Sequence, residues 1–370
     1  MKVLIAIDSF KGSLSSLEAG KAIKEGIQEV MNAEVTICPI ADGGEGTVEA
    51  LSANGELKKT MVTGPLGNKV LAKWAIINAN SQKTAVIEMA EAAGIALLKR
   101  EELNPLNTTT YGVGELIKEA INEGCLNFVI GIGGSSTNDG GTGMLKALGY
   151  SFLDKDNKEI ELGAKGLKDL YSISDTNVIK ELNQCTFKIA CDVKNPLCGI
   201  NGCSAIYGPQ KGADEKMIKE MDEWLLNYAT ISKGDKDYPG TGAAGGMGYA
   251  FKTFLNADLE PGIDIVLNTV NLEEKVKDVD IVITGEGRMD KQTVMGKAPS
   301  GVSKIAKKYN KKVIAFCGCA SDEADICNEY GIDAYFPILR KIASLEEALN
   351  KDNAYFNLKS TAKQVFNLIK

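Results

Sequence analysis

The sequence contains no histidine among its 370 residues. This absence excludes Ser-His-Asp and Cys-His catalytic arrangements, and every metal site that depends on an imidazole ligand. A general base in this chain must therefore come from Asp, Glu, Lys, Cys or Tyr.

Long apolar runs and clusters of positive charge are also missing. No stretch approaches the ~18 consecutive apolar residues that span a membrane. Lys and Arg number 42 against 49 Asp and Glu, which gives a formal net charge of −7, and no basic cluster could follow a nucleic-acid backbone. The opening MKVLIAID lacks the basic region and cleavage site of a signal peptide. We therefore expect a cytoplasmic protein that binds neither membranes nor nucleic acid.

Common nucleotide and metal motifs are absent or incomplete. No GxxxxGK[ST] sequence occurs, so a nucleotide site would have to be of a non-Walker kind. The glycine run 240–245 satisfies GxGxxG, but it follows a polar segment instead of a strand, so we expect close packing there instead of a dinucleotide site. The spacing of Cys191, Cys198 and Cys203 matches no zinc pattern.

The chain alternates short apolar runs with helical periodicity, which predicts a mostly parallel α/β architecture. Its length suggests about two domains. Residues 57–90 differ, with β-rich runs between turn sequences that predict a meander or hairpin. We expect a discontinuous α/β domain, 1–62 plus 283–370, with a second α/β domain, 63–282, inserted into it. A capping box at Ser15 and Glu18 predicts the first helix, and the closing helix is expected to begin near Asn357.

Five of the predicted strands run directly into a polar loop that contains a carboxylate. Because ligands bind outside the carboxyl ends of strands in open α/β sheets, we expect these loops to converge on one crevice or on two facing ones. The loops are 8–12, 42–47, 133–141, 192–196 and 285–290.

These loops have the chemistry of phosphoryl transfer. The Gly, Ser and Thr residues of 131–143 can present N–H groups and hydroxyls to a phosphate or carboxylate. Lys11, Arg288 and Lys297 add positive charge within the loops. Carboxylates beside such a cradle fit Mg²⁺ ligands or the base that accepts a hydroxyl proton.

Long motifs resemble the bacterial glycerate kinase family, in order over nearly the whole chain. They include DSFKGSLS (8–15), PIADGGEGT (39–47), GIGGSSTNDGGTGML (131–145), CDVKNPLCG (191–199) and TGEGRMDKQTVMGKAP (284–299). The resemblance implies a kinase acting on an alcohol group, which uses ATP to convert D-glycerate to 2-phosphoglycerate or 3-phosphoglycerate. It also implies two α/β domains, one flavodoxin-like and one restriction-endonuclease-like, with the active site in the interdomain cleft.

Within these motifs we expect Asp192 to be the base, with Asp8 and Asp42 as rival candidates. Lys11 should neutralise charge, and Glu286 and Asp290 should help to hold Mg²⁺. The residues expected to contact substrate or phosphate are Ser9, Gly43, Gly44, Gly133, Gly134, Ser135, Ser136, Asn138, Asp139, Arg288 and Lys297. Thr108 to Thr110 are interpreted as simple caps of the following helix.

Two other functions are compatible with parts of the sequence. A non-enzymatic regulator that binds a sugar acid or another anion would need the same loops without the chemistry. A dehydrogenase would use the glycine run 240–245 to bind NADH. The sequence leaves open the position of the phosphoryl group, the nucleotide preference and the oligomeric state, with a homodimer among the options.

Overall fold

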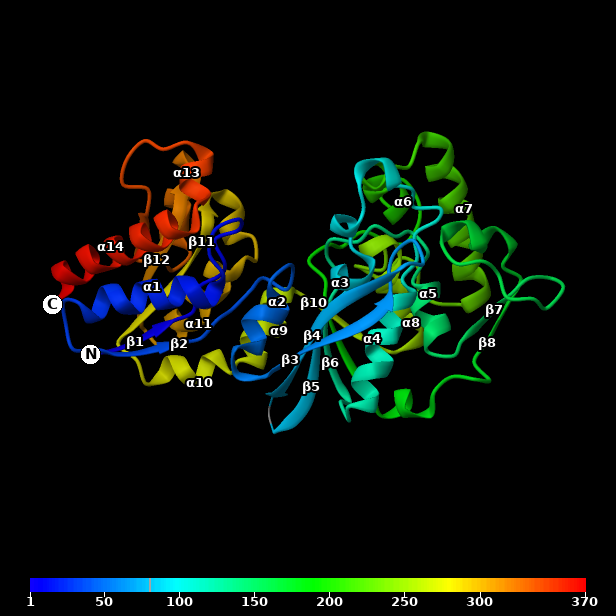
Figure 1. Ribbon diagram of the computed structural model, residues 1–370, viewed down its shortest axis with the longest axis horizontal. Helices are drawn as coiled ribbons and strands as arrows, with labels where there is room; N and C mark the ends of the chain where they lie inside the picture. Colours follow the sequence, from blue (N-terminus) through cyan, green and yellow to red (C-terminus); the bar gives the residue numbers. More distant parts are fainter. Residues whose placement is uncertain (80) are drawn as a thin grey trace. The chain divides into compact units, whose positions relative to one another are not determined.

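The computed structural model describes residues 1–79 and 81–370. These residues divide into two compact units, each an α/β structure (Figure 1). Unit 1 comprises Met1–Asp42, Glu49–Asn54 and Ile263–Lys370, and unit 2 comprises Gly43–Val48 and Gly55–Gly262. The expected partition is discontinuous in the same sense but has other limits, because the units assign 43–48 and 55–62 to unit 2 and 263–282 to unit 1. As a division into folding domains it stays a prediction.

Unit 1 is built on a five-stranded, fully parallel sheet in the order β13-β12-β11-β1-β2. Numbered along this unit, the order is 2-1-3-4-5, which is the order of flavodoxin-like sheets. Its strands are β1 (Lys2–Ile5), β2 (Glu34–Ile37), β11 (Ile281–Met289), β12 (Lys312–Ala320) and β13 (Ala334–Pro337). The direction of the connections reverses between β1 and β11, and ligands bind at such switch points in this class of fold.

Helices cover this sheet because its central strands are apolar on each side. Helices α1 and α14 pack side by side on one face, whereas α10 lies on the opposite side of the sheet (Figure 1). The capping box predicted at Ser15 and Glu18 does begin α1. The helices are α1 (Ser16–Gln28), α9 (Gly262–Thr269, its first residue in unit 2), α10 (Leu272–Lys277), α11 (Ala298–Lys308), α12 (Ile326–Glu329), α13 (Leu345–Leu349) and α14 (Lys351–Ile369).

Unit 2 contains a mixed six-stranded sheet in the order β10-β9-β6-β5-β4-β3. The expected β-rich segment forms the antiparallel strands β3, β4 and β5, and β5 then pairs in parallel with β6. The strands are β3 (Glu56–Thr63), β4 (Lys69–Ala79), β5 (Gln82–Glu88), β6 (Asn127–Gly131), β9 (Thr186–Ala190) and β10 (Asp258–Glu260). A separate hairpin joins β7 (Ser151–Leu153) to β8 (Ser172–Ser174).

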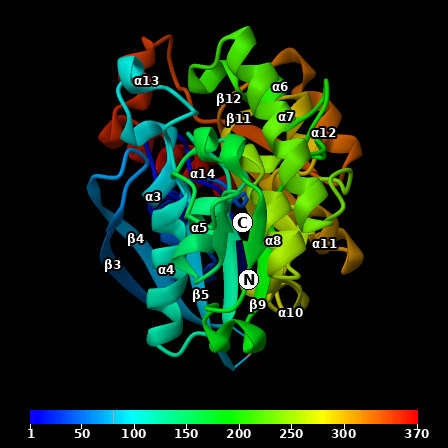
Figure 2. The ribbon, with the colours of Figure 1, turned by 90° about the vertical axis from the view of Figure 1, so that its right-hand side faces the viewer.

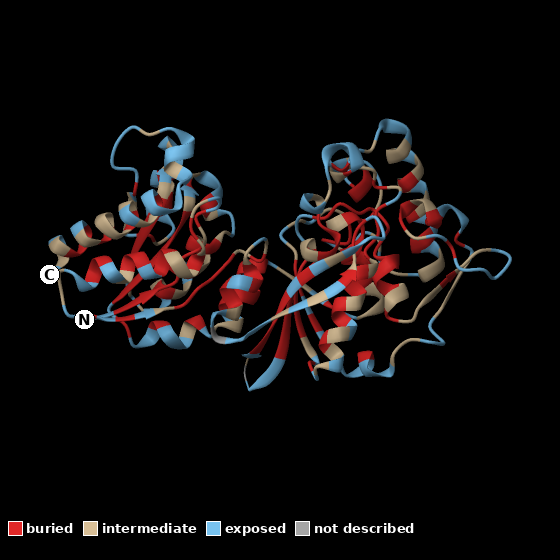
Figure 3. Cartoon of the chain, in the orientation of Figure 1, coloured by how far each residue is buried: buried red, intermediate tan, exposed pale blue. Residues whose placement is uncertain are grey.

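One continuous apolar core joins this sheet to helices α4, α5, α7 and α8. Figure 2 shows α4, α5 and α8 in front of the strands, and Figure 3 shows that burial is concentrated in the central strands β5 and β6, whereas β3 at the edge is largely exposed. The helices assigned to this unit are α3 (Ala90–Ala93), α4 (Tyr111–Asn122), α5 (Thr142–Ala147), α6 (Cys203–Tyr207), α7 (Glu215–Ser232) and α8 (Met247–Phe254), and α2 (Thr47–Leu51) crosses from unit 2 into unit 1. In the part of the chain that the structure describes, no helix combines the length and apolarity needed to cross a membrane.

The predicted closing helix was placed too late in the sequence. Helix α14 begins at Lys351, six residues before Asn357. The side chain of Asn350 accepts hydrogen bonds from the backbone N–H groups of Asp352 and Asn353, and so it caps the helix. This first turn is largely exposed, so it carries little of the apolar periodicity on which the prediction depended.

Close contact between α1 and α14 depends on Gly26. A Cβ atom at this position would lie 2.3 Å from the carbonyl oxygen of Lys359. We predict that Gly26→Ala lowers the free energy of unfolding by about 1–3 kcal/mol, as overpacking typically does. Urea denaturation would measure this, with Gln28→Ala, an exposed change on the same helix, as the control. Stabilisation by Gly26→Ala, as helix propensity alone would give, would show that the two helices separate freely.

Candidate functional site

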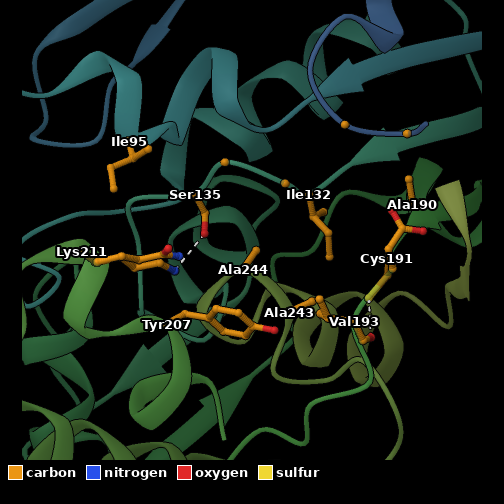
Figure 4. A pocket seen from close by; sticks show the side chains of 16 residues that line it. Ile95, Ile132, Ser135, Ala190, Cys191, Val193, Tyr207, Lys211, Ala243 and Ala244 are labelled. Atoms are coloured by element: carbon orange, nitrogen blue, oxygen red, sulfur yellow. Dashed lines mark hydrogen bonds between the residues drawn. The ribbon is translucent and has the colours of Figure 1, made fainter. Parts of the chain in front are cut away.

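A cavity of about 410 Å³ opens at the carboxyl ends of strands β6 and β9 in unit 2 (Figure 4). Its volume falls in the range of small-molecule sites. The lining mixes glycine backbone, apolar side chains and a few polar groups. The lining residues are Gly43, Gly44, Ile95, Ile132, Gly133, Gly134, Ser135, Ala190, Cys191, Asp192, Val193, Tyr207, Gln210, Lys211, Ala243 and Ala244.

The predicted anion cradle contributes only its first part to this cavity. Gly133, Gly134 and Ser135 line it, whereas Ser136, Asn138 and Asp139 do not. The last three are at most 1% exposed and have protein partners. Their side chains are buried within the loop and do not line the cavity, and their contact with a ligand stays a prediction.

Asp139 organises the loop from within. Its carboxylate accepts hydrogen bonds from the backbone N–H groups of Thr110, Gly141 and Gly143 and from the Thr110 hydroxyl. Burial raises the pKa of Asp139, and these hydrogen bonds oppose the rise. The interpretation of the threonines as helix caps holds only for Thr109, whose hydroxyl accepts a hydrogen bond from the backbone N–H of Tyr111, the first residue of α4. Thr110 instead binds Asp139, and Thr108 donates to the carbonyl of Ser136. No side-chain hydrogen bond from Thr110 caps helix α4.

Asp192 follows strand β9 and is exposed at the cavity. Its Oδ1 accepts a hydrogen bond of 2.9 Å from the backbone N–H of Gly262. Gly43 lies against that residue, because a Cβ at Gly43 would come within 2.4 Å of the Gly262 Cα. Gly43 also has a φ of +92°, so only glycine fits both its conformation and its surroundings. Asp192, Gly43 and Gly44 thus share the cavity with the cradle, as the sequence led us to expect.

The glycine run 240–245 packs closely, as its sequence context predicts. A Cβ at Gly242 would lie 2.1 Å from the carbonyl oxygen of Pro196, and one at Gly245 would lie 2.0 Å from that of Thr137. The run therefore supports the cradle loop from below. Between these glycines, Ala243 and Ala244 reach the cavity wall.

Lys211 and Tyr207 line the cavity, and the sequence analysis did not single them out. Lys211 is only 1% exposed, and its Nζ donates to the Ser135 Oγ at 2.9 Å and to the Thr137 carbonyl at 2.6 Å (Figure 4). Burial lowers the pKa of Lys211 to about 8. The available signal was the sequence YGPQKGA, in which a lysine sits between a proline and a glycine in a short turn.

Unit 1 brings a second set of predicted residues together at its switch point. Asp8 follows β1 and is buried, and Lys11 lies 3.6 Å from Asp42 Oδ2. Burial, then the charge of Asp42, raises the pKa of Asp8 to about 7, and Glu286 contributes in the same direction. The backbone N–H of Ser9 donates to Asp8 and limits this rise. A carboxyl group that titrates near neutral pH is suited to proton transfer.

The predicted metal ligands Glu286 and Asp290 have protein partners. Glu286 accepts from the Thr293 hydroxyl at 2.6 Å and lies 3.5 Å from the Lys297 ammonium. Asp290 accepts from the backbone of Gln292 and pairs with Arg288 at 3.5 Å. Strand β11 also continues through Met289, so Glu286 and Arg288 belong to a strand and not to the loop expected there.

Among residues 1–79 and 81–370, no three Asp, Glu or Cys side chains are grouped closely enough to enclose a metal ion. Mg²⁺ commonly takes only one or two carboxylates and completes its shell with water and phosphate oxygens. Mutual repulsion of Asp8, Asp42 and Glu286 would be relieved by a cation beside them. The donor set in unit 1 therefore fits a partly hydrated Mg²⁺, and it fits better at Asp8 and Asp42 than at Asp290.

The raised pKa of Asp8 predicts a pH-dependent cost in stability. The folded chain keeps this proton up to about pH 7, whereas the unfolded chain releases it near pH 4, so stability falls as the pH rises between these values. We predict that Asp8→Asn, which stays neutral, is more stable than the wild type at pH 8 and equally stable at pH 4. Thermal unfolding at both pH values measures this, with the exposed Asp278→Asn as control. A gain that is equal at both pH values would contradict the raised pKa.

Comparison with known proteins agrees with the resemblance found in the sequence. The profile of the Glycerate kinase family matches residues 3–370. The chain is 47% identical to the glycerate 2-kinase of Escherichia coli (strain K12) over 373 residues, which cover 99% of this chain and 97% of that protein. It is 45% identical to the glycerate kinase of Bacillus subtilis (strain 168) over 378 residues, which cover 100% of this chain and 98% of that one.

A solved structure shows the same fold. The crystal structure of a candidate glycerate kinase 2 from Salmonella typhimurium LT2 is similar to this chain with a TM-score of 0.91 and 44% sequence identity. The match covers 100% of this chain and 98% of that one. On the sequence profile, the relatives and the fold together, the chain belongs to the glycerate kinase family.

Proposed function

We propose that this protein transfers the terminal phosphoryl group of ATP to a hydroxyl group of D-glycerate, with 2-phosphoglycerate as the product. The observation that carries the proposal is the family match over residues 3–370. The 2-position is supported by the name of a relative that is 47% identical, a glycerate 2-kinase. Action in the cytoplasm and assembly as a homodimer stay predictions from the sequence.

The site residues support phosphoryl transfer by positioning and charge neutralisation. In unit 2, the backbone of Gly133 and Gly134 and the ammonium of Lys211 offer hydrogen bonds and positive charge to an anion. In unit 1, Lys11 and Lys297 supply positive charge beside the carboxylates. Phosphoryl transfer needs little covalent chemistry from the protein beyond such positioning.

We propose that Mg²⁺, when bound, neutralises charge on the transferring phosphate. Asp8 and Asp42 would hold it, because a cation beside them would relieve their mutual repulsion. Asp192 would accept the proton of the glycerate hydroxyl, since its carboxylate is exposed at the same cavity as the cradle. Asp8, with a pKa of about 7, is the rival for that role.

The proposed reaction is tested directly by its products. Purified protein with D-glycerate, ATP and Mg²⁺ should release ADP, and phosphorus NMR should identify 2-phosphoglycerate. Detection of 3-phosphoglycerate would keep the kinase and reject the 2-position. Thermal stabilisation by glycerate without ADP release would instead indicate the non-enzymatic anion-binding regulator.

The role of Asp192 is tested by Asp192→Asn, which keeps the shape of the side chain and its acceptor for Gly262. Loss of a general base typically lowers kcat by ~10²–10⁴-fold, and we expect a fall of this size. Asp156→Asn, an exposed change in unit 2, is the matched control. A fall of less than about tenfold, with the variant folded, would remove Asp192 from the role of base.

A further inference from the structure

We propose that Lys211 is the cationic group of an anion-binding subsite in unit 2, which holds a carboxylate or phosphate oxygen of a bound ligand against the backbone of Gly133, Gly134 and Ser135. The inference rests on the proposed function, because glycerate and ATP are the anions that it offers to this site. The two sources share one chemistry, and the experiment below distinguishes them.

Lys211 is buried without a counter-ion. The residue is 1% exposed, and within the described residues no carboxylate lies within the 4.0 Å of an ion pair with its Nζ. In this part of the chain, the one carboxylate that acts on it electrostatically is that of Asp139, which already accepts hydrogen bonds from Thr110, Gly141 and Gly143. A buried charge with no partner is costly. An anion in the cavity would provide the missing charge.

The ammonium of Lys211 has more hydrogen-bond donors than protein acceptors. A lysine ammonium has three donors. The Nζ of Lys211 uses two of them, toward the hydroxyl of Ser135 and the carbonyl of Thr137, and both acceptors are neutral. The third has no acceptor among the residues that the structure describes, although Lys211 lines the cavity. Figure 4 shows the amine directed toward Ser135 at the cavity wall. A ligand oxygen would satisfy this last donor.

The backbone of the cradle residues, Gly133 to Ser135, also has donors without acceptors. In the described chain the N–H groups of Gly133, Gly134 and Ser135 donate to no protein acceptor, although the neighbouring N–H of Ser136 donates to the carbonyl of Ala93. The φ of Gly134 is +71°, and a Cβ at Gly133 would meet nothing within 4 Å. Successive unpaired N–H groups around a left-handed residue form an anion-binding concavity. The cradle and the ammonium thus face the same anion chemistry from one cavity.

Hydrogen bonds within the protein hold the subsite in place before a ligand binds. Asp139 and the hydroxyl of Thr110 hold the end of the loop, and the Ser136 hydroxyl donates to the carbonyl of Ala93. Lys211 itself ties Ser135 to Thr137. Donors that are already in place need no reorganisation when an anion binds, so the interaction keeps its full strength.

The titration of Lys211 supplies a second readout. Its pKa is lowered to about 8 by burial, while Cys203 and Asp139 act in the opposite direction. Cys203, on helix α6, stays neutral near pH 8 because burial raises its pKa to about 11. Ser135 and Thr137, the other contacts of the Nζ, carry no charge. Loss of the ammonium above pH 8 should therefore weaken the binding of an anion.

The experiment compares Lys211→Met with the wild type. Methionine keeps much of the apolar side chain and removes the charge and its donors. Lys146→Met is the matched control, because Lys146 is also largely buried in unit 2 but pairs with Glu159 away from the cavity. The KM values for D-glycerate and for ATP are measured, together with calorimetric binding of D-glycerate and of ADP to each folded variant.

We expect Lys211→Met to weaken one ligand by about 10- to 100-fold, as loss of a charged hydrogen bond does. The other ligand and the control should stay within about threefold, and kcat should change less than the affected KM. An effect on glycerate identifies a carboxylate as the bound anion, and an effect on ATP and ADP identifies a phosphate. If Lys211→Met does not fold, the wild type still decides, because its affinity for that ligand should fall up to tenfold per pH unit above about pH 8.

Wild-type affinities in Lys211→Met for both ligands would overturn the proposal, and so would wild-type binding that is constant from pH 7 to about pH 9.5. These failures differ from failure of the proposed function. A wild-type protein that forms no ADP but binds glycerate or ADP only with Lys211 present would reject the kinase and retain the subsite. An active kinase whose Lys211→Met variant binds both ligands normally would reject the subsite alone.

Discussion

The buried carboxylate of Asp139 is the constraint on which the unit 2 site depends. Four donors from Thr110, Gly141 and Gly143 converge on it, and they connect the start of helix α4 to the start of α5. Burying a charge is favourable only when hydrogen bonds replace its water. The loop that supplies those bonds therefore has one conformation, and in that conformation the N–H groups of Gly133 and Gly134 are left for a ligand.

Much of the fold could be predicted because burial on both faces makes strands such as β1 read as uninterrupted apolar runs. The family resemblance implied one flavodoxin-like domain, and the strand order of unit 1 is of that type. The limits of strand β11 were missed, since Gly285 to Met289 look like a loop in sequence. They remain in the sheet because Gly285, Glu286, Arg288 and Met289 pair with the neighbouring strand β12, a contact that local sequence does not encode.

The site was predicted best where chemistry and position in the chain coincide. Asp192 and Gly133 follow strands, so the general rule for α/β sheets places them at a ligand site, and the cavity contains both. The rule fails for Asp139. This carboxylate also lies in a loop that follows a strand, but it is buried and holds that loop together. Lys211 was missed for the opposite reason. It follows no strand, and its burial arises from tertiary contacts with Ser135 and Thr137, residues more than 70 positions earlier.

Asp8 and Lys211 are perturbed in opposite directions by the same cause. Burial raises the pKa of the acid and lowers that of the base, so each is least favourable in its charged form. A cation bound beside Asp8, or an anion bound beside Lys211, would favour the charged form of that residue. The free-energy cost of burying the charge would then be offset when the ligand binds. Burial thus suits the Asp8 site to a cation and the Lys211 site to an anion, although unit 1 also carries Lys11 and unit 2 also carries Asp192. The proposed transfer of a phosphoryl group would use groups of both kinds, and the chain carries a buried acid and a buried base with these properties.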